Sequence, residues 1–187
     1  MLVKKQIIIT ALLSALYSSY AAANLGFDFS SGEGIMDIKP YRLGVSWDFG
    51  SIWREEENWG LNAIWESSVS RWDRNDTKSV GNNNRMDVVT TGPMFRWQRQ
   101  APFSPFHIMP YLELGVGASW LSDTEIGGRR LSLHFQFEDK VGIGVRFGRN
   151  GKYDLSLRGY HYSNASLKRP NSGVNLAMIS FGYWLDN

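Results

Sequence analysis

Several long segments of the chain alternate apolar and polar residues with a period of two. In residues 41–49 the odd positions hold Tyr41, Leu43, Val45, Trp47 and Phe49, and the even positions hold Arg42, Gly44, Ser46 and Asp48. The same alternation runs through residues 111–121 and 131–147, and weaker versions run through 59–72 and 86–97. Alternation of this period predicts β-strands with one apolar and one polar face.

Together with their neighbours these segments give eight predicted strands, at about residues 24–32, 36–49, 58–72, 84–98, 106–122, 130–148, 152–163 and 174–185. An even number suits an antiparallel barrel whose two chain ends lie on the periplasmic side of an outer membrane. The short connection Arg149-Asn150-Gly151 then falls on that side, with Gly151 suited to the left-handed position of a three-residue hairpin.

The polar faces of the predicted strands carry charges of both signs. A small closed barrel packs such residues into interior ion pairs and turns its aliphatic and aromatic face to lipid, so the fold class expected is an eight-stranded antiparallel transmembrane β-barrel. The alternative is a soluble exported lectin-like sandwich, which would lack the membrane-facing aromatic band. The predicted interior charges are Arg42, Asp48, Glu66, Arg96, Glu113, Glu138, Lys140, Arg146, Asp154 and Arg158.

The first residues read MLVKKQIIITALLSALYSSYAAAN, with Lys4 and Lys5 before a short apolar stretch and small residues at 21–23. This pattern predicts a secretory signal peptide over residues 1–23, with the barrel occupying 24–187. The apolar stretch is too short for a spanning helix. The chain has no Cys, so no disulfide is expected, and its formal charge of +2 gives no argument for nucleic acid as a partner.

The seventh predicted strand carries an unusual pair of polar residues. Its interior parity holds Asp154, Ser156 and Arg158, so His161 and Ser163 have the parity of the lipid-facing side, at the outer-leaflet end. Polar groups facing a bilayer are costly and, when present, usually functional. Two interpretations stay open from the pattern alone: a catalytic His–Ser pair, or two polar residues among lipid headgroups.

Three stretches, "HYSNASLKRPNSG", "YRLGVSWDF" and "FEDKVGIGVRF", resemble the PagL family of outer-membrane lipid A 3-O-deacylases. The resemblance implies an eight-stranded barrel with its active site on the lipid-facing surface. It implies Ser163 as nucleophile and His161 as base, acting on the 3-position ester of lipid A and releasing a 3-hydroxy fatty acid. Neither a metal nor another cofactor is expected. Asn164, or backbone amides of the following loop with Asn171 and Gly173, is expected to hold the oxyanion and substrate.

The chain departs from the family at the residue that orients the His. The family has a Glu twelve residues after the Ser, and that position here is Asn175. An Asn oxygen can accept the imidazole N–H, but it supplies no charge, and in a Ser–His–Asp protease the change from acid to amide costs about 10⁴ in rate.

Asp139 is a candidate for a substitute acid. It has the parity of the apolar face, and a hairpin at Arg149-Asn150-Gly151 sets it opposite His161, where Cβ atoms are about 5 Å apart. We therefore predict that Asp139 supports His161; the alternative is a bulge that turns it inward, or a different register.

The expected partners are lipopolysaccharide and outer-membrane lipid, and a homodimer is possible. Lys168 and Arg169 in the outer loop either contact lipid A phosphates or are solvated charges. Two other functions compete with the esterase: a catalytically weak or inactive family member, and a structural or adhesive small barrel.

Overall fold

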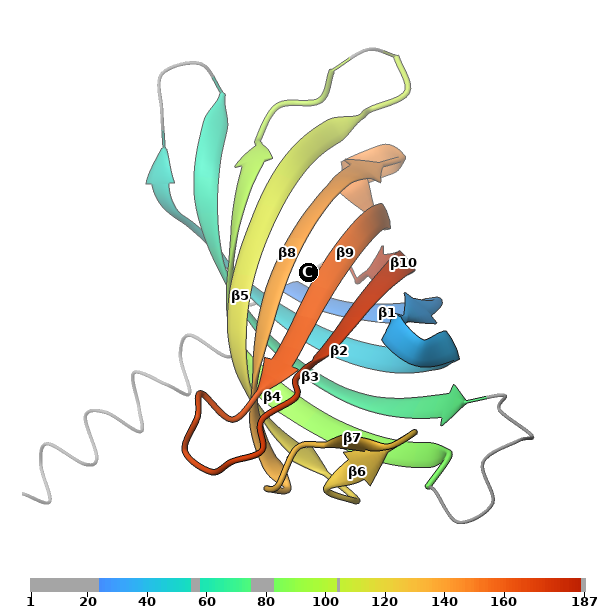
Figure 1. Ribbon diagram of the computed structural model, residues 1–187. Helices are drawn as coiled ribbons and strands as arrows, with labels where there is room; N and C mark the ends of the chain where they lie inside the picture. Colours follow the sequence, from blue (N-terminus) through green and yellow to red (C-terminus); the bar gives the residue numbers. More distant parts are fainter. Residues whose placement is uncertain (1–23, 55–57, 75–82, 104, 186–187) are drawn as a thin grey trace, which may run out of the picture.

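The computed structural model describes residues 24–54, 58–74, 83–103 and 105–185. Eight antiparallel strands close into a barrel in the order β1-β10-β9-β8-β5-β4-β3-β2 (Figure 1). The closed barrel confirms the predicted fold class and rules out the open sandwich. The strands are β1 (Asn24–Gly34), β2 (Ile38–Arg54), β3 (Trp59–Arg74), β4 (Arg85–Arg99), β5 (Met109–Leu121), β8 (Phe135–Phe147), β9 (Tyr153–Ser163) and β10 (Val174–Trp184).

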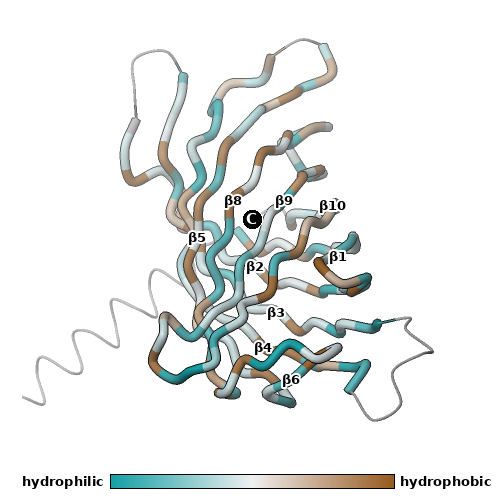
Figure 2. Tube along the Cα trace, in the orientation of Figure 1, coloured by the Kyte–Doolittle hydropathy of each residue, from teal (hydrophilic) through white to brown (hydrophobic). Residues whose placement is uncertain are grey.

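The alternation seen in the sequence separates the barrel interior from its outer wall, and Figure 2 shows polar and apolar positions interleaved along the strands. Every charged residue predicted for the interior is buried. These residues form ion pairs across the lumen, including Arg42 with Glu66 and Glu138, and Arg96 with Glu113 and Asp154. Because both partners of each pair are buried, the pairs satisfy charges that the barrel encloses.

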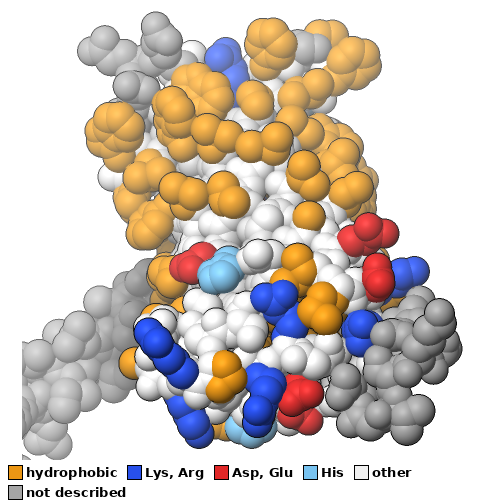
Figure 3. Space-filling view, in the orientation of Figure 1, with side chains coloured by type: hydrophobic (Ala, Val, Ile, Leu, Met, Phe, Trp, Pro, Cys, Tyr) orange, Lys and Arg blue, Asp and Glu red, His pale blue; other side chains and the backbone are white. Residues whose placement is uncertain are grey.

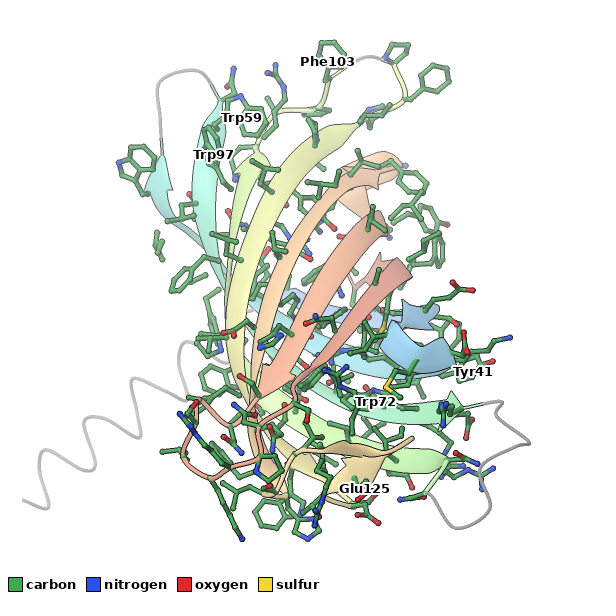
Figure 4. All side chains as sticks on the ribbon, viewed as in Figure 1. Tyr41, Trp59, Trp72, Trp97, Phe103 and Glu125 are labelled. Carbon is green, nitrogen blue, oxygen red and sulfur yellow. The ribbon has the colours of Figure 1, made fainter. Side chains whose placement is uncertain are left out.

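The outer wall is apolar over most of its height. Figure 3 shows hydrophobic side chains over the part of this face nearer the 100–108 connection, and charged side chains gathered at the opposite end. Trp59, Trp97 and Phe103 project near the first end (Figure 4), as interfacial aromatic residues of membrane barrels do. No helix among the described residues is long and apolar enough to cross a membrane.

The two ends of the barrel differ in their connections. One end has the 148–152 turn, where Gly151 adopts a φ of +65°, the left-handed conformation expected for it. The opposite end has the longer segments 122–134 and 164–173. Outer-membrane barrels have their longer loops on the extracellular side. The 100–108 connection lies at the first end, but the longest connection between barrel strands is 122–134, so the second end is the outer end.

Two predicted boundaries are wrong. The sixth strand of the barrel begins at Phe135, not near 130, because residues before it form a small outer hairpin, β6 (Glu125–Ile126) and β7 (Arg129–Arg130). Leu131, predicted on the lipid face, is instead fully buried with Ile126 in an apolar cluster under this hairpin. The second strand continues past Phe49 to Arg54 through an irregularity after Asp48. The predicted signal peptide lies outside the described residues.

Candidate active site

Three polar residues form one row across neighbouring strands on the outer wall. His161 on β9 lies directly opposite Asp139 on β8 and opposite Asn175 on β10. All three side chains are exposed, as the lipid-facing parity predicts. The predicted register between Asp139 and His161 is therefore confirmed, and the alternative of a bulge that turns Asp139 inward is wrong.

The imidazole of His161 is held by Asn175. Its Nδ1 lies 2.6 Å from Asn175 Oδ1. An amide oxygen only accepts hydrogen bonds, so in this arrangement Nδ1 carries the proton and Nε2 keeps its lone pair. This is the tautomer that a general base requires.

Ser163 follows His161 on the same outer face of β9, two residues or about 6.6 Å further along the strand. It is half-buried and lies opposite Phe137 of β8. Within the described part of the chain, no hydrogen bond joins Ser163 Oγ to His161. Catalytic hydrogen bonds often tighten only when the substrate is bound, so this arrangement is compatible with a catalytic pair.

The strand that carries this pair is anchored from inside the barrel by Tyr162. Its ring packs edge-on against Trp72 at a centroid distance of 4.7 Å, and its hydroxyl donates a hydrogen bond to Glu138. Arg42 also donates to the Tyr162 hydroxyl, at 3.1 Å. Because Tyr162 lies between His161 and Ser163, these interior contacts fix the backbone from which both side chains project.

The outer loop after β9 returns to the imidazole at Gly173. A Cβ on this residue would lie 3.1 Å from His161 Cε1, and the backbone there has a φ of +58°. Arg129 holds this part of the loop: its guanidinium donates to the carbonyl oxygens of Ser172 at 2.6 Å and Gly173 at 3.0 Å. Arg129 could not be predicted from the sequence, because its contact spans more than forty residues and no local pattern marks it.

Asn164 does not have the role expected for its side chain. It is fully buried, and its Nδ2 donates to the carbonyl oxygens of Leu131 and Lys168. Its backbone N donates to Asn171 Oδ1 at 3.1 Å. The expectation that the Asn164 side chain holds the oxyanion is therefore wrong, because residue 164 has the interior parity. Asn171 accepts a hydrogen bond that closes the loop.

The predicted hydrogen bond or ion pair from Asp139 to His161 is not seen among the described residues. Although the two residues are opposite each other, no hydrogen bond or ion pair joins their side chains in the residues that the structure describes, and Nδ1 is occupied by Asn175. Register sets which residues are neighbours, whereas side-chain rotation decides which of two neighbours is bonded. The side chain bonded to the imidazole is thus that of Asn175, not Asp139.

An apolar groove of about 630 Å³ lies on the same wall, toward the end of the barrel that has the 148–152 turn. Leu155 and Leu157 of β9 line it together with Leu112, Ile143 and Ile179 from neighbouring strands. Leu157 has the same outward parity as His161 and Ser163. A hydrocarbon chain that extends from Ser163 into the membrane would run toward this groove.

Comparison with known proteins agrees with this geometry. The family model "Lipid A 3-O-deacylase (PagL)" matches residues 40–184. The chain is 31% identical to the lipid A deacylase PagL of Pseudomonas aeruginosa over 172 residues, covering 91% of this chain and 93% of that protein. It is 29% identical to the lipid A deacylase PagL of Bordetella bronchiseptica over 145 residues, covering 76% and 75%.

The crystal structure of the outer membrane enzyme PagL matches the barrel with a TM-score of 0.72 and 26% identity, covering 84% of this chain and 98% of that one. Matches of this extent, in both sequence and structure, include the strands that carry the row at His161. The chain belongs to the lipid A 3-O-deacylase (PagL) family.

Proposed function

We propose that Ser163 and His161 carry out the reaction of the family, the hydrolysis of the ester-linked 3-hydroxyacyl chain at the 3-position of lipid A. Membership of the family gives the activity, an ester hydrolase, and the location, the outer membrane. The proposal assigns the nucleophile to Ser163 and the base to His161. The observation that carries these roles is the hydrogen bond that His161 Nδ1–H donates to Asn175 Oδ1, which leaves Nε2 basic on the face that also carries Ser163.

In the first half-reaction, Ser163 Oγ attacks the ester carbonyl while His161 Nε2 takes the hydroxyl proton. The tetrahedral intermediate collapses when His161 returns this proton to the sugar oxygen, which leaves as the free 3-hydroxyl group of lipid A. Water, activated by the same imidazole, then attacks the acyl-serine. The products are a free 3-hydroxy fatty acid and regenerated Ser163.

The surroundings supply the other requirements of such a site. A backbone N–H of the loop that ends at Gly173 is the candidate oxyanion donor, because Gly173 allows the backbone to approach the imidazole closely. The apolar outer wall of β9 that leads from Ser163 toward the groove at Leu157 suits the acyl chain. Lys168 and Arg169, both exposed in the outer loop, would contact lipid A phosphates through charge-assisted hydrogen bonds.

The test is a mass measurement on lipid A. Refolded wild-type protein in detergent should remove one 3-hydroxyacyl group from lipopolysaccharide, and Ser163→Ala and His161→Ala should each lower the rate by at least about 10³-fold. Ser67→Ala is the matched control, because Ser67 is another half-buried serine on the outer wall, on β3. Full activity of Ser163→Ala would overturn the nucleophile assignment.

The same assay addresses the weaker alternative, a family member that Asn175 leaves nearly inactive. If the folded wild type removed no acyl group from lipid A, the nearly inactive alternative would be favoured. One further prediction accompanies the proposal: residues 1–23 act as an export signal, which sequencing the N-terminus of the exported protein will test. The mass of the barrel in detergent will distinguish a monomer from a homodimer.

A further inference from the structure

A second site for an amphipathic lipid is indicated on the wall opposite the candidate active site. The barrel order places β3 four strands from β9 in either direction. On the outer face of β2, β3 and β4, three successive cross-strand rows change from charged to apolar toward the membrane interior. The rows are Lys39–Asp73–Arg85, Tyr41–Arg71–Asp87 and Leu43–Val69–Val89.

The charged rows form a polar cleft of about 530 Å³ at the outer end of the barrel. It is lined by Lys39, Arg74 and Arg85, together with Asp73. Arg85 pairs with Asp73 at 3.0 Å, with its side chain 67% exposed, so its guanidinium has N–H groups directed to the surroundings as well. The cleft thus presents more cationic than acidic side chains.

The apolar row opens into a groove of about 450 Å³ directly below. Phe29, Leu43, Val69 and Val89 line it, and each is about half exposed. Tyr41 lines both the cleft and the groove, which makes them continuous, and Figure 4 shows it at the same end of the barrel as Glu125 of the outer hairpin. At the junction Arg71 and Asp87 form a two-point ion pair on the outer wall.

Charged side chains on the outer wall are costly in hydrocarbon, so these rows belong at the level of the headgroups. Counting the residues that line the cleft and the groove, the cations Lys39, Arg42, Arg71, Arg74 and Arg85 outnumber the acids Asp73 and Asp87. Arg42 is committed to the interior pairs, and Arg74 has the interior parity of Ile38, its neighbour on β2, which leaves three cations against two acids on the outer wall. Such a surface complements phosphate groups carried above acyl chains.

We propose that this wall binds one molecule of phosphorylated lipid A as a non-substrate lipid, with its phosphate at Lys39 and Arg85 and an acyl chain in the groove at Val69. The proposal rests on the proposed function only in assigning this end of the barrel to the outer leaflet. Phosphorylated lipid A is preferred to a phospholipid because the cationic residues extend over two rows, about 7 Å apart, which suits a wide sugar-phosphate headgroup. A lipid bound here cannot reach Ser163.

Native mass spectrometry of the Ser163→Ala protein, which does not consume its ligand, tests the proposal. With bisphosphorylated lipid A as the probe, Ser163→Ala should retain two lipids. Adding Lys39→Gln and Arg85→Gln should weaken retention of one of them by about tenfold or more, since charge-assisted contacts are lost. Arg149→Gln, which removes an exposed cation at the other end of the barrel, should leave the retention of both lipids unchanged. A higher salt concentration should weaken binding of the same lipid that the double substitution affects.

A second variant tests the groove separately. Val69→Trp fills the apolar row without changing any charge, and should also weaken the second lipid while the barrel stays folded, because Val69 faces outward. Equal retention of both lipids by the Lys39→Gln/Arg85→Gln protein would overturn the proposal. So would equal retention of phosphatidylglycerol or dephosphorylated lipid A, which would indicate an ordinary lipid shell. Since binding is the readout, these results are independent of whether Ser163 is the nucleophile.

Discussion

Replacing Asn175 with Asp tests how the imidazole is oriented. Asp has the shape of Asn, so its carboxylate would take the place of the amide oxygen that now lies 2.6 Å from His161 Nδ1. The carboxylate cannot donate a hydrogen bond, so it enforces the productive tautomer, and it stabilises the imidazolium that forms during the reaction. The substitution is therefore expected to raise activity.

The size of the gain follows from the hydrogen bond. A bond to a charged group contributes about 1.5–3 kcal/mol and one between neutral groups about 0.5–1.5 kcal/mol. The difference, about 1–1.5 kcal/mol, corresponds to a gain of roughly 5- to 13-fold in kcat/KM. The change of about 10⁴ seen in a buried Ser–His–Asp triad is an upper bound, because His161 and Asn175 are exposed.

The assay is the initial rate of 3-hydroxy fatty acid release from lipid A in detergent micelles. Asn175→Ala removes the acceptor and is expected to lower kcat by about 10²-fold, as loss of an orienting group does. Asn175→Glu restores the family's residue and should also exceed the wild type. If Asn175→Asp were no faster than wild type, and Asn175→Ala equally active, Asn175 would have no orienting role.

Three other substitutions test the support of the site and of the barrel. Gly173→Ala should lower kcat by about tenfold, since a Cβ there meets the imidazole, and should cost about 1–2 kcal/mol in stability, since the backbone is left-handed; an unchanged kcat would contradict this. Arg129→Gln should lower kcat and speed proteolysis of the outer loop, with partial rescue by Arg129→Lys and no effect of Arg130→Gln, whose side chain is 71% exposed. Arg42→Met leaves the buried carboxylate of Glu138 without an ion pair and should lower the free energy of unfolding in urea by about 3–5 kcal/mol, whereas Arg71→Met, on the exposed wall, should have little effect.

The period-two pattern was sufficient to predict the barrel and the face of each strand. One face of each strand is buried in the barrel and the other faces lipid, so both faces constrain the sequence. A register shift of one residue would turn every side chain of the strand to the wrong face. For this reason the parity of His161 and its position opposite Asp139 could be predicted from the chain alone. The same rule does not act in the 122–134 segment, where Leu131 packs under a hairpin rather than in a barrel strand.

The parts of the site that the sequence did not reveal depend on side-chain rotation and on contacts between loops. Asp139 and Asn175 are both neighbours of His161 in register, and only the three-dimensional arrangement shows that Asn175 is bonded. The inward direction of Asn164 follows from its parity, but the motif drew attention to its chemistry instead. Arg129 lies far from Gly173 in the sequence and contacts only its backbone oxygen, which leaves no trace in the residue types.

Labelling with an alkyl fluorophosphonate, which reacts with activated serines, tests the central claim most directly. Digestion with trypsin should release the peptide from Gly159 to Lys168, which contains both Ser163 and Ser166, and fragmentation can locate the label. The predicted result is a label on Ser163 that rises in step with loss of lipid A deacylation and is absent from His161→Ala. Complete inactivation with the label on another residue, or full labelling of Ser163 with activity retained, would contradict the assignment of Ser163 as the nucleophile.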